Sequence, residues 1–221
     1  MTRTFRLLAL TMISGASVWL PNWAAGQVAP MVPVAEKVLT VKNVFGLESN
    51  ARLRTPVYTV NGGGKIVRSN ASGIREWIQV VAEYNTTPDA KARWLNQVSF
   101  QFYLLTVNEG RESKQKEYTL FRGTAAYMDV DRNRREARWA TLYLRPSGLA
   151  RYGEPVAVAV EVSADGRLLE SKSEVDRKYT EVLGKEWWKN AKLTVKDGYL
   201  LKASDTPFSY VNYDDFEEIA Q

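Results

Sequence analysis

VAVAVEVSADGRLLES, residues 156–171, is the stretch that decides the fold. Valine occupies every second position from Val156 to Val162, which is the two-residue period of a β-strand with one apolar face. Asp165-Gly166 follows, and this dipeptide is typical of the tight turn in a β-hairpin. The stretch therefore predicts a buried strand and a second strand, Leu168–Ser171, that pairs back on it.

Similar patterns lie on both sides of this hairpin. Residues 97–107 and 137–144 alternate clearly between apolar and other side chains, so each predicts a strand. Ile74–Tyr84 fits both helical and strand spacing, but its β-branched and aromatic residues favour a strand. The other predicted strands are Val38–Phe45, Pro56–Val60, Tyr118–Phe121, Ala125–Val130, and a second hairpin made of Lys192–Val195 and Tyr199–Lys202.

A helix is expected only in Ser173–Ala191, where Gly184 would interrupt it. Seven to nine short strands with at most one short helix predict an antiparallel β-sandwich, with a closed barrel as the alternative. We expect this domain to span residues 27–205. Residues 206–221 are expected to form a docking tail that is rich in aromatic residues and carboxylates. Its aromatic residues Tyr210, Tyr213 and Phe216 are the candidate contact residues.

Residues 1–26 have the order of a secretory signal peptide. Two arginines precede the uncharged run Leu7–Leu20, and small residues follow it, so we predict cleavage between Gly26 and Gln27. The run of 14 residues is shorter than the roughly 20 that a bilayer-spanning helix needs. No cysteine follows the predicted cut, which excludes a lipid anchor there. The protein is therefore expected in the periplasm, at the outer membrane or outside the cell.

The composition excludes several classes of function. The chain has no cysteine, so disulfides are excluded, and no histidine, so Ser-His-Asp catalysis and histidine-ligated zinc are excluded. Without the two arginines of residues 1–26, 28 basic residues face 25 acidic ones, a net charge of +3. This small excess does not indicate nucleic-acid binding. We expect no catalytic residue, metal or cofactor.

One possible metal motif fails on inspection. Asp129, Asp131 and Asn133 alternate like the start of a calcium-binding loop. However, Arg134 stands at the sixth position, where glycine is needed, and Ala140 at the twelfth, where glutamate is needed. We therefore interpret these residues as a solvated loop.

Trp187 and Trp188 are the most conspicuous candidates for a contact surface. Adjacent residues on a regular helix or strand cannot both face one core, so we expect one ring in the core and the other either packed under the C-terminal tail or partly exposed. Lys185 and Lys189 flank the pair. An exposed tryptophan there would be able to stack on a sugar or contact a partner chain.

Two stretches carry a resemblance to a known group of proteins. WLNQVSFQFY at Trp94–Tyr103, and ATLYLRP at Ala140–Pro146 followed by Leu149–Gly153, resemble small exported immunoglobulin-like proteins. Those proteins accompany type IV pilus-like gene clusters in mucin-dwelling gut bacteria. The resemblance implies an immunoglobulin-like sandwich, a surface or outer-membrane location, self-association and no enzymatic activity, and it assigns no functional residue.

The leader distinguishes this chain from a pilin. A pilin has a short leader cut before a long hydrophobic helix, whereas here a general secretory leader precedes a stretch broken by Pro30 and Pro33. We therefore expect an accessory component of pilus-like machinery rather than a major subunit. The leading hypothesis is a non-enzymatic envelope protein that acts by protein contact, with self-association included. The alternatives are a carbohydrate-binding module and, third, a carboxylate-based hydrolase.

Overall fold

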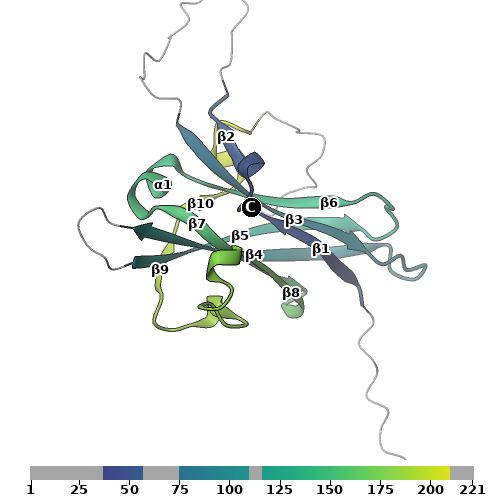
Figure 1. Cartoon of the computed structure of the whole chain (residues 1–221). Coiled ribbons are helices and arrows are strands. Elements are labelled where there is room, and N and C mark those ends of the chain that lie inside the picture. The colour runs from purple at the N-terminus through teal and green to yellow at the C-terminus, as the bar shows by residue number, and fades with distance from the viewer. Residues whose placement is uncertain (1–36, 57–74, 110–115, 210–221) are drawn as a thin grey trace, which may run out of the picture. The chain divides into compact units, whose positions relative to one another are not determined.

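The computed structural model describes residues 37–56, 75–109 and 116–209, which form two packed β-sheets (Figure 1). The first sheet has the order β1-β3-β6-β10, with β2 paired to β3, and the second has the order β8-β7-β4-β5-β9. The predicted β-sandwich is therefore confirmed. The predicted leader 1–26, its cut between Gly26 and Gln27, and Tyr210, Tyr213 and Phe216 lie outside the described residues.

The ten strands in the described ranges are antiparallel except for one pair, β5 and β9, which is parallel. The first sheet contains β1 (Leu39–Phe45), β2 (Arg52–Arg54), β3 (Glu76–Thr86), β6 (Arg138–Leu144) and β10 (Leu200–Leu201). The second sheet contains β4 (Trp94–Glu109), β5 (Lys116–Asp131), β7 (Glu154–Ala164), β8 (Arg167–Val175) and β9 (Thr194–Asp197). The helical elements of the described residues are α1 (Pro146–Tyr152) and four 3-10 turns: η1 (Ser49–Ala51), η2 (Arg177–Tyr179), η3 (Trp187–Lys189) and η4 (Ala203–Asp205).

The hairpin predicted from residues 156–171 is confirmed. β7 pairs with β8, and Ala164 lies opposite Arg167 across the turn. Val158, Val160 and Val162 are fully buried in the core between the sheets. In that core the ring of Phe100 lies 4.7 Å from the ring of Tyr84, measured between centroids. The alternating valines thus fill the space between the two sheets, as a two-residue period requires.

Some strand predictions are wrong in detail, and one lies almost wholly outside the described residues. Tyr118–Phe121 and Ala125–Val130 belong to one strand, β5. The short strand β2 was not predicted. Of the predicted strand Pro56–Val60, only Pro56 is described, and it lies outside any strand. The second hairpin does not exist, because β9 pairs with β5 and β10 pairs with β6 of the other sheet.

The turn at Gly198 therefore moves the chain between sheets instead of closing a hairpin. Leu200 is buried in the main core, opposite Leu144 of β6. There its Cβ packs over Gly123 of β5 so closely that a Cβ added to that glycine would lie 2.6 Å away. Burial of Leu200 in the core thus decides the pairing, which the Asp197-Gly198 dipeptide alone does not specify.

The helix predicted over Ser173–Ala191 is also wrong. β8 continues through Val175, and the rest of the segment contains only the short turns η2 and η3. The α-helix of the described chain is α1, which begins with Pro146 and ends before Gly153 at a φ of +83°. Proline at the first turn and glycine just after the last residue are the usual helix boundaries.

Candidate interaction surfaces

Both outer faces of the sandwich carry aromatic side chains, and the second sheet is the more fully covered. Residues 177–193, here called the cover segment, lie over it. Tyr179, Trp187 and Trp188 of this segment pack against buried apolar residues of β4, β5 and β7: Leu105, Val107, Leu120, Val156, Ala157 and Ala159. The second sheet is thus buried on both of its faces along this part of its length.

The prediction that the two tryptophans cannot both face one core is wrong, and neither ring is partly exposed. Trp187 is 4% and Trp188 is 7% exposed. Their rings lie 5.6 Å apart at 84°, an edge-to-face contact. Both can face the same sheet because η3 is a single 3-10 turn, so the alternation of a long helix or strand does not apply. Their role in partner contact stays a prediction, and neither ring is open in the structure.

A carboxylate of β7 holds the cover segment in place. Glu161 accepts hydrogen bonds from Tyr103 Oη at 2.9 Å and from Trp188 Nε1 at 3.0 Å, and Lys189 Nζ lies 3.5 Å from the same carboxylate. Burial alone would raise the pKa of Glu161, but the hydrogen bonds from Trp188 and Tyr103 and the charge of Lys189 together lower it. Burial, followed by the bond to Glu161, raises the pKa of Tyr103 to about 12.

The outer face of the first sheet is covered by the start of the predicted docking tail. Phe208 is 5% exposed and stacks on Tyr143 of β6, with centroids 4.9 Å apart and planes at 10°. It also meets Trp77 of β3 edge-on at 5.8 Å. Thr206 Oγ1 donates to the carbonyl of Ala203 at 2.8 Å and so shapes the turn before Phe208. Residues 206–209 therefore pack on their own domain.

Next to Phe208 the same face is open. Here Phe45, Val81, Glu83 and Trp139 form a surface that we call the Trp139 face. Register places Phe45 opposite Val81 and Glu83 opposite Trp139. The side chain of Trp139 is 46% exposed. Sequence reasoning did not single out Trp139, although the alternation in 137–144 already places it opposite the apolar face, and that signal could have found it.

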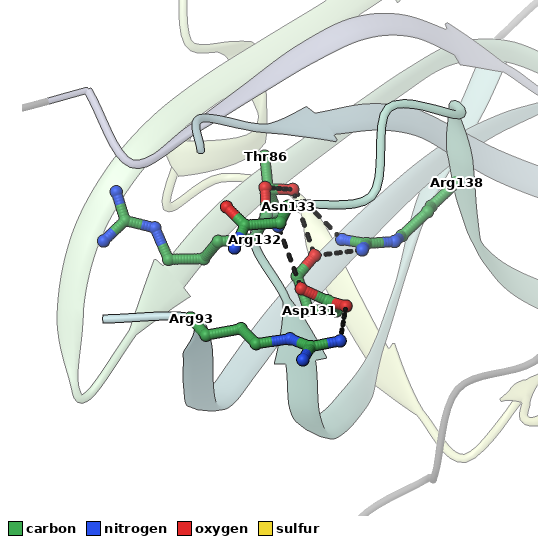
Figure 2. A network of polar contacts seen from close by, with 6 residues as sticks. All are labelled: Thr86, Arg93, Asp131, Arg132, Asn133 and Arg138. Atoms are coloured by element: carbon green, nitrogen blue, oxygen red, sulfur yellow. Dashed lines mark hydrogen bonds and ion pairs between the residues drawn. The ribbon is translucent and has the colours of Figure 1, made fainter. Parts of the chain in front are cut away.

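Two loops at one end of the sandwich are joined by a polar network (Figure 2). Buried Arg138 donates to Thr86 Oγ1 at 3.2 Å and to the backbone carbonyl of Asp131. Arg93 pairs with the Asp131 carboxylate at 3.2 Å, and the backbone N–H of Asn133 donates to it at 2.9 Å. The network links the β3–β4 loop to the β5–β6 loop, and it occupies one of the carboxylates of the rejected calcium motif.

These contacts also affect the charge state of Asp131. The hydrogen bond from Asn133 and that from Arg93 lower its pKa.

No group of three or more acidic side chains in the described ranges is arranged to hold a metal ion. We find no described helix that is long and apolar enough to cross a bilayer.

The edge strands β1 and β8 of the two sheets are closed against each other. Glu170 Oε2 of β8 accepts a hydrogen bond from the backbone N–H of Val41 in β1 at 2.8 Å. Lys172 Nζ of β8 lies 3.4 Å from the carbonyl of Val41. A β-bulge between Val41 and Asn43 interrupts β1 at this point. The two charged side chains thus occupy backbone groups that would otherwise be free to pair with another strand.

Comparisons with known proteins agree with this architecture. The model of one protein family matches residues 40–221. A crystal structure of a protein from Akkermansia muciniphila superposes with a TM-score of 0.63 at 19% sequence identity, covering 83% of this chain and 93% of that chain. At this identity the likeness shows the fold alone. No curated protein matches the chain.

Proposed function

Since the chain belongs to the family whose model matches residues 40–221, we propose that it is a non-enzymatic protein of the cell envelope that acts through protein–protein contact. The secretory leader predicted for residues 1–26 supports export, and the packed sandwich supplies a rigid surface for binding. The observation that carries the proposal is the Trp139 face, where a half-exposed tryptophan lies opposite Glu83, and the apolar pair Val81 and Phe45 lies in the next row of the same face. Tryptophan is enriched among residues that dominate binding energy.

Fixed geometry makes this face suitable for recognition. Trp139 lies on β6, which pairs with β3 over seven residues, Arg138 to Leu144. Next to it, Phe208 stacks on Tyr143 and closes the other part of the same outer face. A partner would therefore bind a preformed surface and would lose little conformational freedom of the sandwich on binding.

We infer an accessory component of pilus-like machinery as the finer form of this function. Its support is the resemblance of Trp94–Tyr103 and Ala140–Pro146 to exported immunoglobulin-like proteins encoded beside such machinery. The general secretory leader predicted for residues 1–26 favours an accessory role over that of a pilus subunit.

The test places a photo-crosslinking amino acid at position 139 in the native envelope. The expected result is one crosslinked protein partner, which is absent when the same probe replaces Leu168. Leu168 is 55% exposed in the β7–β8 hairpin and so controls for exposure. Equal patterns from the two positions would contradict the proposal. Mass spectrometry of the mature N-terminus tests export, and a chain beginning at Gln27 is expected.

A carbohydrate-binding module is the second candidate, and the same face favours it. Asn43 Nδ2 donates to Glu83 Oε2 at 2.7 Å, and Glu83 lies opposite Trp139. An aromatic ring beside a carboxylate and an amide is a combination that can stack on and hydrogen-bond a sugar. On a glycan array, binding that Trp139→Ala abolishes and Trp188→Phe preserves would favour this candidate over protein contact.

A further inference from the structure

The outside of the cover segment is basic and partly apolar. Residues 177–193 contain five Lys or Arg and two Glu, a net charge of +3. Val182 is 68% exposed, and no atom lies within 4 Å of a Cβ built on Gly184. Beside them lies a pocket of about 340 Å³ that is lined by Val182, Leu193 and Trp187, by Lys185, and by the ion pair of Lys189 with Glu186. This surface can accept an apolar side chain that is accompanied by negative charge.

Trp187, which lines this pocket, has a buried donor that lacks an acceptor. The indole Nε1–H of Trp187 is buried and has no hydrogen-bond partner in the part of the chain that the structure describes. The neighbouring Trp188 donates to Glu161, so the two rings differ in this respect. A buried donor without an acceptor costs about 1–3 kcal/mol. A bound chain that inserts a carbonyl or carboxylate oxygen beside Trp187 would remove this cost.

A segment of the same sequence has the complementary chemistry. Residues 210–221 contain four carboxylates and no basic residue. The four acids, Asp214, Asp215, Glu217 and Glu218, surround Phe216. Negative charge on both sides of an aromatic ring matches a basic surface with an apolar pocket.

The position of Phe208, which precedes residues 210–221, bears on whether these residues reach the cover segment of their own chain or that of a second copy. Phe208 is fastened to the outer face of the first sheet, whereas the cover segment lies on the outer face of the second sheet. The acids follow Phe208 by 6 to 10 residues, a span of about 20–35 Å when fully extended. Within one copy the acids would have to pass from the outer face of the first sheet to that of the second, whereas a second copy can bring its cover segment directly to them.

We propose that residues 213–218 of one copy dock on the cover segment of a second copy, with Phe216 in the pocket beside Val182 and the acids against Lys185 and Lys192. This inference rests on the proposed function and names one partner, the chain itself. The contact joins two different surfaces, so it is a head-to-tail association that builds rings or open chains of copies.

The experiment uses two charge-reversed forms of the mature full-length protein, Lys185→Glu/Lys192→Glu and Asp214→Lys/Asp215→Lys. Sedimentation velocity measures self-association over a concentration series at low and high ionic strength. The wild type is expected to associate, and less so in high salt. Each variant alone is expected to associate at least about tenfold more weakly. An equal mixture of the two is expected to recover association, because the reversed surfaces are again complementary.

The matched control is Lys91→Glu/Arg167→Glu, which reverses two exposed basic residues outside the cover segment and is expected to associate like the wild type. Near-ultraviolet circular dichroism of each variant checks that the sandwich is folded. A wild type that stays monomeric, a control as weak as the cover-segment variant, or a mixture that fails to recover association would each overturn the proposal. Crosslinking at position 139 is independent of these charges, so the failure of the proposed function is separately visible.

Discussion

Trp188 donates the hydrogen of its indole Nε1 to Glu161 Oε1 at 3.0 Å, and this bond fastens the cover segment to the second sheet. The adjacent Trp187 is equally buried, but its Nε1 has no acceptor among the described residues. The two rings thus share a location and a chemical type and differ in one hydrogen bond.

Replacing each tryptophan by phenylalanine isolates that bond. Trp188→Phe loses a hydrogen bond to a charged group, worth about 1.5–3 kcal/mol, in addition to the packing lost by shrinking the ring. Trp187→Phe loses packing and also removes an unpaired donor, so it serves as the matched control. In urea unfolding we expect Trp188→Phe to be less stable than Trp187→Phe by at least about 1.5 kcal/mol. Equal losses would show that the bond to Glu161 contributes nothing.

Acidic pH should weaken the attachment of the cover segment to Glu161. The pKa of Glu161 is lowered from 4.5 in the folded protein, because the bonds from Trp188 and Tyr103 and the charge of Lys189 outweigh burial, which acts in the opposite direction. A lowered folded pKa adds stability that is complete above pH 4.5 and is lost as the pH falls through the folded pKa. Unfolding free energies of wild type and Glu161→Gln, measured from neutral to acidic pH, should therefore converge below pH 4.5. A difference that is constant with pH would contradict this linkage.

Phe208 should stabilise the fold although it lies outside the core between the sheets. It is 5% exposed and contacts the rings of Tyr143 and Trp77. We expect Phe208→Ala to lower the free energy of unfolding by about 3 kcal/mol. Leu168→Ala removes an apolar side chain that is 55% exposed and should change it by less than about 0.5 kcal/mol. Similar losses of unfolding free energy for both variants in urea would mean that the packing of Phe208 on the first sheet does not stabilise the fold.

Gly153 and Gly198 share a positive φ and differ in their surroundings. Their φ angles are +83° and +76°. A Cβ on Gly153 would lie 2.0 Å from the carbonyl oxygen of Val107, whereas a Cβ on Gly198 meets nothing within 4 Å. Gly198→Ala should cost about 1–2 kcal/mol from backbone strain alone. Gly153→Ala should lower the free energy of unfolding by about 1–3 kcal/mol more than Gly198→Ala, because the backbone around Val107 must move to make room for the new Cβ. Thermal unfolding in which Gly198→Ala is the less stable variant would refute this.

The Glu170 contact to β1 predicts a local effect on hydrogen exchange. The N–H of Val41 donates to the Glu170 carboxylate at 2.8 Å, so Glu170→Ala leaves that donor without its acceptor. The amide of Val41 should then exchange faster, while amides in the centre of β3 keep their rates. Ser171→Ala changes an exposed neighbour in the same strand and should have no effect. Unchanged exchange at Val41 in Glu170→Ala would show that the edge is closed by other contacts.

Local patterns predicted the centre of this fold well. The alternating valines of β7 and the Asp165-Gly166 turn specify strand, core face and hairpin together, because side chains alternate strictly along a strand and the turn directly joins two neighbouring strands. Pro146 and Gly153 also bracket α1 in the sequence, but the helix is too short for its periodicity to stand out.

Tertiary packing decided what local patterns leave open. Asp197-Gly198 is also a turn dipeptide, yet its two strands join different sheets, because Leu200 is buried in the main core. Trp187 and Trp188 are both buried because a 3-10 turn lays them on a sheet surface that only the assembled fold provides. The sequence by itself determined the sandwich and the classes of chemistry that its missing cysteine and histidine exclude. The three-dimensional fold alone decided that Trp139 is open while the tryptophan pair is covered, since exposure depends on which segments cover which face.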